Sequence, residues 1–293
     1  MVDQFFGTDF MPTGDVALAY RVEGTGDPVV LVHGGVSDLR TWSKQVPVLG
    51  QHFRTIAYSR RFARPNDDIL DGEDDQMQPH VDDLANFIQS SGATPSHLVG
   101  HSWGAFIVLL AAIQHPELVR SIVLIEPPVL SLFIDLPPKP RQVLSLLMKA
   151  PRTAVAILKL GRKVMSPAEK AFRRGDDKAA IEIFGKGVLG ASRFSRLSPE
   201  RMQQVWDNRK TEKAQMLGAG FPPLVDADVR TATVPALLLA GDASPYAFRR
   251  MSERLGDLLP NARLVVIDGA SHIVHEDAPE KTNEILVEFL MAH

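Results

Sequence analysis

The sequence predicts an α/β protein in which helices cover both faces of a mostly parallel central sheet. Two observations predict this fold class. Short apolar runs rich in Val, Ile and Leu alternate with longer stretches of helical pattern, as in parallel sheets that are buried on both faces. The runs stop after Glu126 and resume only at Pro235, which indicates a helical insertion between neighbouring strands.

The strands are expected at these apolar runs, because Val, Ile and Leu suit a strand buried on both faces. A run from Val16 to Val22 precedes the others and is expected to pair at an edge of the sheet. The remaining runs are Pro28–His33, Arg54–Ser59, Ser96–Gly100, Ser121–Glu126, Pro235–Ala240 and Arg263–Asp268.

The segments between the strands carry helical patterns. Residues 81–90 place apolar side chains at i, i+3, i+4 and i+7, which predicts a helix with one buried face. The segment Ala105–Gln114 is apolar almost all round, so we expect a buried helix beneath the centre of the sheet. Inside the insertion, helices are expected at Gln142–Lys149, Arg152–Val164, Lys178–Phe184 and Glu200–Lys213.

The insertion is expected to form a cap over the strand ends. Five prolines between residues 127 and 140 break regular structure where it begins. We therefore expect residues 1–128 and 234–293 to form an α/β core domain and residues 129–233 to form the helical cap. The cap is basic, with 18 Lys and Arg and 7 Asp and Glu from Lys139 to Lys213, against 14 and 28 elsewhere.

This charge pattern leaves several interpretations of the cap open. The first is a cap whose charges are largely solvated. The alternatives are attraction of an anionic substrate or contact with an anionic membrane surface. The basic residues carry no recognisable nucleic-acid reading motif, so no nucleic-acid partner is expected.

A G-x-S-x-G motif, Gly100-His101-Ser102-Trp103-Gly104, lies between a predicted strand and a predicted helix. A serine at such a tight turn needs small residues two positions before and after it, since side chains there would collide with the strand and helix. The turn exposes the hydroxyl above the sheet, and the following helix N-terminus favours developing negative charge. Ser102 is therefore the candidate nucleophile.

A serine hydroxyl needs a base, which must come from elsewhere in the chain. His272 follows the last predicted strand, and Gly269, Ala270 and Ser271 before it suit a loop that bends over the sheet edge. We expect His272 to be the base.

Two glycines end an earlier strand, in His33-Gly34-Gly35. Glycine lets the backbone approach a ligand closely, so the amide of Gly35, together with that of Trp103, is expected to hold the oxyanion of a tetrahedral intermediate. His33 is expected to shape this loop.

The segments HGG, GHSWG and GASH, in this order and at these intervals, resemble the α/β-hydrolase fold superfamily. The resemblance covers nearly the whole chain, with 129–233 as the cap, and implies the α/β-hydrolase fold, a catalytic triad and a hydrolytic reaction. It fixes no substrate.

The triad acid departs from the common pattern of that superfamily. Many relatives carry G-x-x-D-P after the next-to-last strand, whereas this sequence places Ser244 where the acid stands. Glu126, at the end of the strand after the nucleophile helix, is the first candidate, and some lipases and the zearalenone-type lactonases have an acid there. Asp242 is the alternative, and loss of the acid is a third possibility.

The pocket is expected to be largely hydrophobic. Gly34, Trp42, His101, Leu132 and Phe133 are its candidate substrate-binding residues. Three arginines at positions 60, 61 and 64 are expected to structure a loop near its mouth, or to contact Asp67, Asp68 or a substrate carboxylate.

These observations predict hydrolysis of a small, largely apolar carboxylic ester or lactone through an acyl-enzyme. Carbon–carbon bond hydrolysis, cofactor-free perhydrolysis and a ligand-binding receptor without turnover are the alternatives. No cofactor and no metal are expected, because no histidine–carboxylate cluster at ligand spacing lies near the serine motif.

The remaining expectations concern the chain as a whole. Cysteine is absent, which excludes disulfides and a cysteine nucleophile. The segment MVDQFFGTDF resembles neither a signal peptide nor a membrane anchor, so no transmembrane segment and a cytoplasmic location are expected. Monomer and homodimer both stay open.

Overall fold

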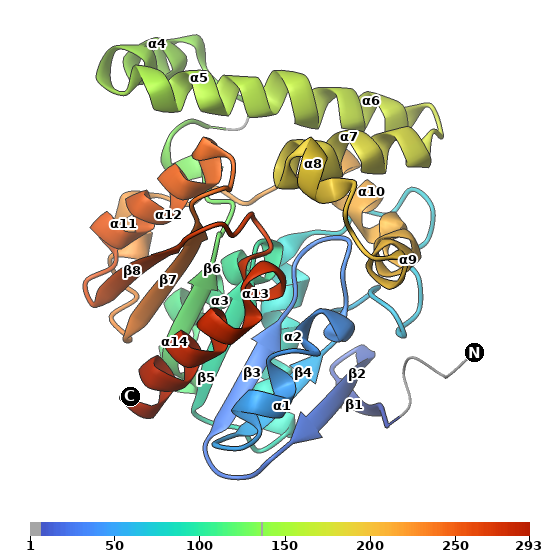
Figure 1. The fold of residues 1–293 in the computed structure, drawn as a ribbon, viewed down its shortest axis with the longest axis vertical. Coiled ribbons are helices and arrows are strands. Elements are labelled where there is room, and N and C mark those ends of the chain that lie inside the picture. Colours follow the sequence, from blue (N-terminus) through green and yellow to red (C-terminus); the bar gives the residue numbers. More distant parts are fainter. Residues whose placement is uncertain (1–6, 136) are drawn as a thin grey trace.

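The computed structural model describes residues 7–135 and 137–293, and these fold around one eight-stranded sheet (Figure 1). The strand order is β1-β2-β4-β3-β5-β6-β7-β8. Strands β1 and β4 pair antiparallel with β2, and all other pairs are parallel. The strands are β1 Asp9–Thr13, β2 Val16–Glu23, β3 Pro28–Val32, β4 Arg54–Tyr58, β5 Ser96–His101, β6 Val119–Ile125, β7 Ala236–Gly241 and β8 Ala262–Ile267.

The fold class expected from the sequence is confirmed, with one correction at the edge of the sheet. Strand β2 is not at the edge, because β1 pairs outside it from Asp9↔Tyr20 to Thr13↔Val16. Strand β1 reads Asp-Phe-Met-Pro-Thr and is mostly exposed. An exposed edge strand needs no run of apolar residues, so the pattern of buried strands does not reveal it.

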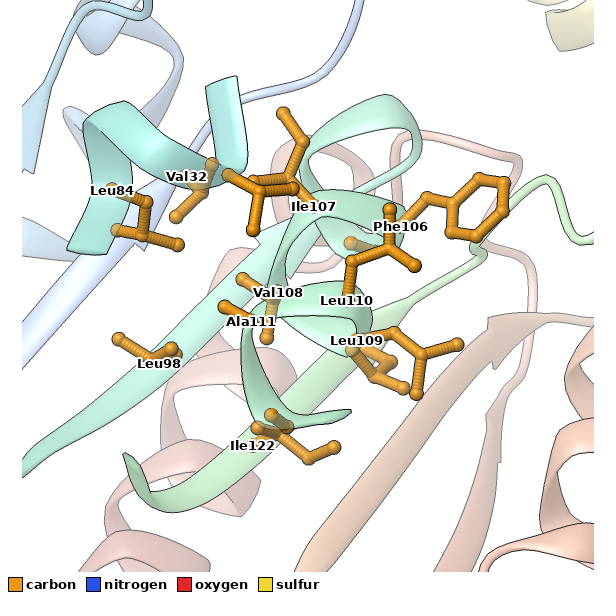
Figure 2. Close-up of a cluster of buried hydrophobic side chains, with 14 of the residues drawn as sticks. Val32, Leu84, Leu98, Phe106, Ile107, Val108, Leu109, Leu110, Ala111 and Ile122 are labelled. Atoms are coloured by element: carbon orange, nitrogen blue, oxygen red, sulfur yellow. The ribbon is translucent and has the colours of Figure 1, made fainter. Parts of the chain in front are cut away.

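Helices cover both faces of the sheet. One hydrophobic cluster joins the sheet to α2 Met77–Ser90, α3 Trp103–Gln114 and α12 Tyr246–Leu258, and a second cluster joins the opposite face to α1 Val46–Leu49 and α14 Pro279–Met291. Figure 2 shows α3, whose Phe106, Ile107 and Val108 lie in the first cluster. Short elements complete the core: η1 Leu39–Trp42, η2 Pro116–Leu118, η3 Leu130–Leu132, α11 Asp226–Val229 and α13 Val274–Asp277.

Helix α3 is buried along almost its entire length, since every residue from Trp103 to Ala112 is buried. It packs mainly on the neighbouring strands β5 and β6, and also contacts α2. This agrees with the expectation of a helix without a polar face, and it fixes the position of the turn that precedes α3.

A group of helices stands between β6 and β7 in the chain and lies above the sheet in Figure 1. Phe172, Ile181, Phe194 and Val205 form a small core inside it. Its helices are α4 Pro140–Lys149, α5 Pro151–Leu160, the π-helix η4 Gly161–Met165, α6 Ser166–Arg173, α7 Asp177–Leu189, α8 Ala191–Phe194, α9 Pro199–Asp207 and α10 Arg209–Leu217.

The sequence predicts one helix over Glu200–Lys213, but the structure has two. Helix α9 ends at Asp207, and Asn208 has φ −104° and ψ 15° before α10 begins. The Asn208 side chain donates a hydrogen bond of 2.7 Å to the buried carboxylate of Asp38. This contact with the core is long-range, so the local pattern does not predict the break.

Candidate active site

Ser102 lies on a strained turn between β5 and α3. Its φ of 50° and ψ of −118° are unfavourable for a residue with a side chain. The Ser102 amide donates to the Ile125 carbonyl at 2.8 Å, which helps to hold the turn. A Cβ on Gly104 would lie 2.3 Å from the Val32 carbonyl oxygen, and one on Gly100 would lie 2.6 Å from backbone. Both small residues of the motif are therefore sterically required.

His272 lies in the loop after β8 and is buried. Its Nδ1 is 2.7 Å from Oε2 of Glu126. An ionised carboxylate only accepts hydrogen bonds, so Nδ1 is the donor and the neutral ring has its lone pair at Nε2. His272 and Ser102 line the same cavity. This arrangement leaves Nε2 as the atom able to take a proton from a hydroxyl.

Glu126 is completely buried at the end of β6, with a φ of 48°. Besides His272, its carboxylate accepts hydrogen bonds from the Gly241 amide at 2.9 Å and the Ser244 hydroxyl at 2.5 Å. Ser244 occupies the position where related sequences place the acid, and here it supports a carboxylate that comes from the neighbouring strand. Hydrogen bonds to a carboxylate are short and strong, and these three hold the Glu126 carboxylate in position.

Asp242 is placed differently. Its side chain is exposed, and its Oδ1 accepts a hydrogen bond of 2.6 Å from the Gly269 amide. The structure therefore brings Glu126, and not Asp242, into contact with the His272 ring.

The candidate oxyanion donors lie beside Ser102. Gly35 and Trp103 both line its cavity. Gly34 precedes Gly35 in the loop after β3. The Gly34 carbonyl accepts a hydrogen bond from Nη2 of Arg60 at 3.0 Å, and a Cβ on Gly34 would lie 2.9 Å from the His101 ring. Gly34 therefore supports the loop, whereas Gly35 faces the cavity.

His33 and Arg60 hold this loop from below. The Arg60 amide donates to Nε2 of His33 at 2.9 Å, and the Arg60 guanidinium lies 4.8 Å from the ring centre of Trp103. Burial, with Arg60 close by, keeps the pKa of His33 well below its usual value. His33 is thus a neutral acceptor that shapes the loop, as the sequence indicates.

His101 lines the cavity, but its Nε2 donates to the His272 carbonyl at 3.0 Å. Burial lowers the pKa of His101 well below its usual value, so the ring is neutral. Its polar contact holds the backbone of the His272 loop.

Four of the five expected substrate-binding residues lie outside the lining of the cavity: Gly34, Trp42, Leu132 and Phe133. Trp42 is fully buried in the opposite hydrophobic cluster, with its ring centre 4.5 Å from that of His275. Leu132 and Phe133 pack against the main core. Most of the apolar lining comes instead from the inserted helices, whose buried faces the sequence pattern does not assign to the cavity. The apolar lining is instead Pro128, Leu130, Leu160, Met165, Ile181, Phe184, Val188, Leu189, Phe194, Leu197, Val205, Met216, Phe221, Phe248, Met251 and Ile273.

The three arginines after β4 bind protein groups. Arg61 forms an ion pair of 2.6 Å with Asp83, and Arg64 lies 3.5 Å from Asp68. Arg60 is buried and bonded to backbone carbonyls. The structural role expected for this segment fits these contacts.

The sequence pattern does not predict the polar residues that the inserted helices contribute to the cavity. Arg201 on α9 and Glu212 and Gln215 on α10 all line the cavity. In sequence they look like the charged and polar residues of any exposed helix, and only the folding of α9 and α10 over the strand ends buries them.

In residues 7–135 and 137–293, no group of three or more His, Cys, Asp and Glu is placed to hold a metal ion. None of the helices in the described part of the chain is long and apolar enough to cross a membrane.

Known proteins resemble this chain both locally and along its length. Strigolactone esterase D14 of Arabidopsis thaliana is 38% identical over 112 residues, which are 37% of this chain and 42% of that protein. The 2-(acetamidomethylene)succinate hydrolase of Mesorhizobium japonicum is 27% identical over 281 residues, covering 95% of this chain and 93% of that protein. A thermophilic esterase from Thermogutta terrifontis shares the fold, with a TM-score of 0.75 and 23% identity over 97% of this chain and 98% of its own.

The family model described as alpha/beta hydrolase fold matches residues 27–279, a range that includes Ser102, Glu126 and His272. Together with the eight-stranded, mostly parallel sheet, this match shows that the protein belongs to the alpha/beta hydrolase fold family.

Proposed function

We propose that the protein is a serine hydrolase that cleaves a carboxylic ester or lactone through an acyl-enzyme. One observation carries this proposal: His272 binds the buried carboxylate of Glu126 through Nδ1 at 2.7 Å, in the same cavity as Ser102. An imidazole held through Nδ1 by a carboxylate, in the same cavity as a strained and partly exposed serine, is the arrangement that nucleophilic catalysis requires.

The reaction follows from these contacts. The Ser102 hydroxyl attacks the carbonyl carbon while Nε2 of His272 takes its proton, and Glu126 stabilises the imidazolium. The amides of Gly35 and Trp103 hold the oxyanion. The imidazolium then protonates the leaving oxygen, giving the acyl-enzyme, and water attacks the acyl carbon by the same route. A lactone reacts in the same way, with its leaving oxygen still attached to the acyl chain.

The cavity favours a small apolar substrate. Its volume is about 150 Å³ and its lining is mainly aliphatic and aromatic. A cavity of this kind takes a group of roughly the size of benzene. One relative is named strigolactone esterase D14, and this name supports an ester or a lactone as the class of substrate. We also propose that 129–233 acts as a cap that shields the acyl-enzyme from bulk water.

A labelling experiment tests the nucleophile. A fluorophosphonate should label the protein stoichiometrically at Ser102, and Ser102→Ala should lose both the label and the hydrolysis of a nitrophenyl ester. Ser195→Ala, which changes an exposed serine, is the matched control and should retain both. Labelling at another serine, or unchanged hydrolysis by Ser102→Ala, would contradict the proposal.

The same experiment separates the alternatives. A protein that binds an ester without labelling or turnover would be a receptor. If Ser102 is labelled but no ester is hydrolysed, two product analyses separate the remaining enzymes. Cleavage of a diketone would indicate carbon–carbon bond hydrolysis, and formation of a peracid in the presence of hydrogen peroxide would indicate perhydrolysis.

A further inference from the structure

A carboxyl group faces the candidate oxyanion site from above. Glu212 on α10 is only 5% exposed and lines the cavity with Ser102 and Gly35. Its Oε2 lies 2.5 Å from the position that a Cβ on Gly35 would occupy. Any side chain at position 35 would therefore displace this carboxyl group. Because residue 35 is glycine, its backbone and the Glu212 carboxyl group can lie close together at the same end of the cavity.

This carboxyl group has no hydrogen-bond partner among the residues that the structure describes. Its polar neighbours are already engaged: Asp75 bonds to His80 at 2.6 Å and to Gln215 at 2.7 Å. Arg60 donates to the carbonyls of the oxyanion loop. The Glu212 side chain is buried but lines the cavity, so a ligand in the cavity can reach its carboxyl group and form the hydrogen bond that the protein does not supply.

The protonation state of Glu212 decides what it offers that ligand. Burial raises the pKa of Glu212 to about 7, with Asp75 adding to the rise and Arg60 opposing it. Arg201, from α9, is paired with Glu276 at 3.0 Å. The histidines nearby are His101 and His272, which line the cavity, and His33 and His80, which contact Arg60. Near neutral pH a large fraction of Glu212 is therefore uncharged and carries a proton to donate.

We propose that Glu212, as a neutral carboxylic acid, donates a hydrogen bond to the substrate oxygen that the amides of Gly35 and Trp103 bind. This inference rests on the proposed function. A carboxylic acid kept neutral by an apolar site can serve in an oxyanion hole. The ionised form would place a negative charge beside the oxygen that becomes negative, and would slow the reaction.

The probe for this inference is an alkyl fluorophosphonate, whose phosphoryl oxygen occupies the same site. We would measure the second-order rate constant of Ser102 labelling from pH 5.5 to pH 9. For the unaltered protein it should fall above pH 7, by about 10²-fold at pH 9, because the neutral fraction of an acid two pH units above its pKa is about one per cent.

Two variants of Glu212 and one control complete the experiment. In Glu212→Gln the amide donates at every pH, so the decline above pH 7 should disappear. Glu212→Met removes the donor and should lower the rate constant at pH 6 by roughly 10²-fold. Glu200→Gln makes the same chemical change on the exposed surface and should keep the unaltered profile.

The outcomes separate this inference from the proposed function. No labelling of Ser102 in the unaltered protein would refute both. Labelling with the same pH profile in Glu212→Gln would refute only the role of Glu212 and leave it as a structural residue. If Glu212→Met does not fold, the profile of the nearly isosteric Glu212→Gln still decides the question.

Discussion

Glu126 receives hydrogen bonds from His272, from the Gly241 amide and from the Ser244 hydroxyl. A buried carboxylate held by three hydrogen bonds keeps its position. Asp242 has none of these features, because it is exposed and bonded to the Gly269 amide. At the scale of single residues, these contacts make Glu126 the proposed triad acid and the position at which a substitution tests the proposal most directly.

We expect Glu126→Gln to lower kcat by roughly 10⁴-fold, as losing the charge of a triad acid does. The amide is the same size but cannot stabilise an imidazolium and can favour the wrong tautomer. Asp242→Asn should change kcat by less than about tenfold, since it alters only a loop contact. The measurement is the hydrolysis of a nitrophenyl ester, and a larger loss in Asp242→Asn would move the acid to position 242.

The sequence predicts those site residues whose roles depend on local geometry. Ser102 is recognised because the glycines of its motif serve a tight turn, and His272 because its loop follows a strand. The choice between Glu126 and Asp242 depends on contacts across strands, which the sequence leaves open. Glu212 carries no local signal, because its role depends on where α10 lies.

At the scale of elements, Asp38 joins the inserted helices to the core. Its buried carboxylate accepts hydrogen bonds from Arg40, from Nε2 of Gln204 at 2.8 Å and from Nδ2 of Asn208 at 2.7 Å. It also caps η1 through the Arg40 amide. Asp38 thus holds the junction between α9 and α10, together with the Arg64 amide, which donates to Oδ1 of Asn208 at 2.8 Å.

Asp38→Ala should destabilise the protein by about 3 kcal/mol, because it leaves buried donors without an acceptor and removes the partner of a cation. The free energy of unfolding in urea measures this loss, and proteolysis should become faster within α9 and α10. Asp135→Ala, which breaks an exposed ion pair with Lys139, is the control and should have no measurable effect. Equal stability of the two variants would show that Asp38 does not hold the junction.

The elements themselves are predictable where packing follows the sequence pattern. The buried strands and α3 show the expected apolar runs, and the structure contains them with small changes of boundary. Strand β1 and the break at Asn208 are not predictable in this way. The first is exposed, and the second depends on a side chain that is distant in sequence.

At the scale of the whole molecule, the basic inserted helices lie against acidic parts of the core. Lys210 pairs with Asp68 at 2.9 Å and Arg201 with Glu276 at 3.0 Å. Arg193 also contacts Asp277. Some of the positive charge seen in the sequence is therefore paired with the core rather than solvated.

The pH dependence of stability should reflect Glu212. Its pKa is raised from 4.5 to about 7 in the folded protein, so the folded state binds the proton more tightly than the unfolded state does. The contribution of Glu212 to the free energy of unfolding is fully present below about pH 4.3, and it is lost as the pH rises through 7. The loss approaches about 3 kcal/mol.

Comparing the unaltered protein with Glu212→Gln isolates this effect, because glutamine does not titrate. Relative to the unaltered protein, the variant should gain stability between pH 5 and pH 8, measured as the difference in the free energy of unfolding in urea. A difference that is the same at both pH values would contradict the buried, raised pKa.

The hydroxyl of Ser244 has a wider consequence for how such enzymes are classified. A survey that identifies hydrolases by an aspartate at this position would count the chain among inactive relatives. Here the buried carboxylate stands at the end of the adjacent strand β6, and the Ser244 hydroxyl donates a hydrogen bond to it. Diversity within such a family is therefore better followed through the shared position in space of the acid than through its place in an alignment.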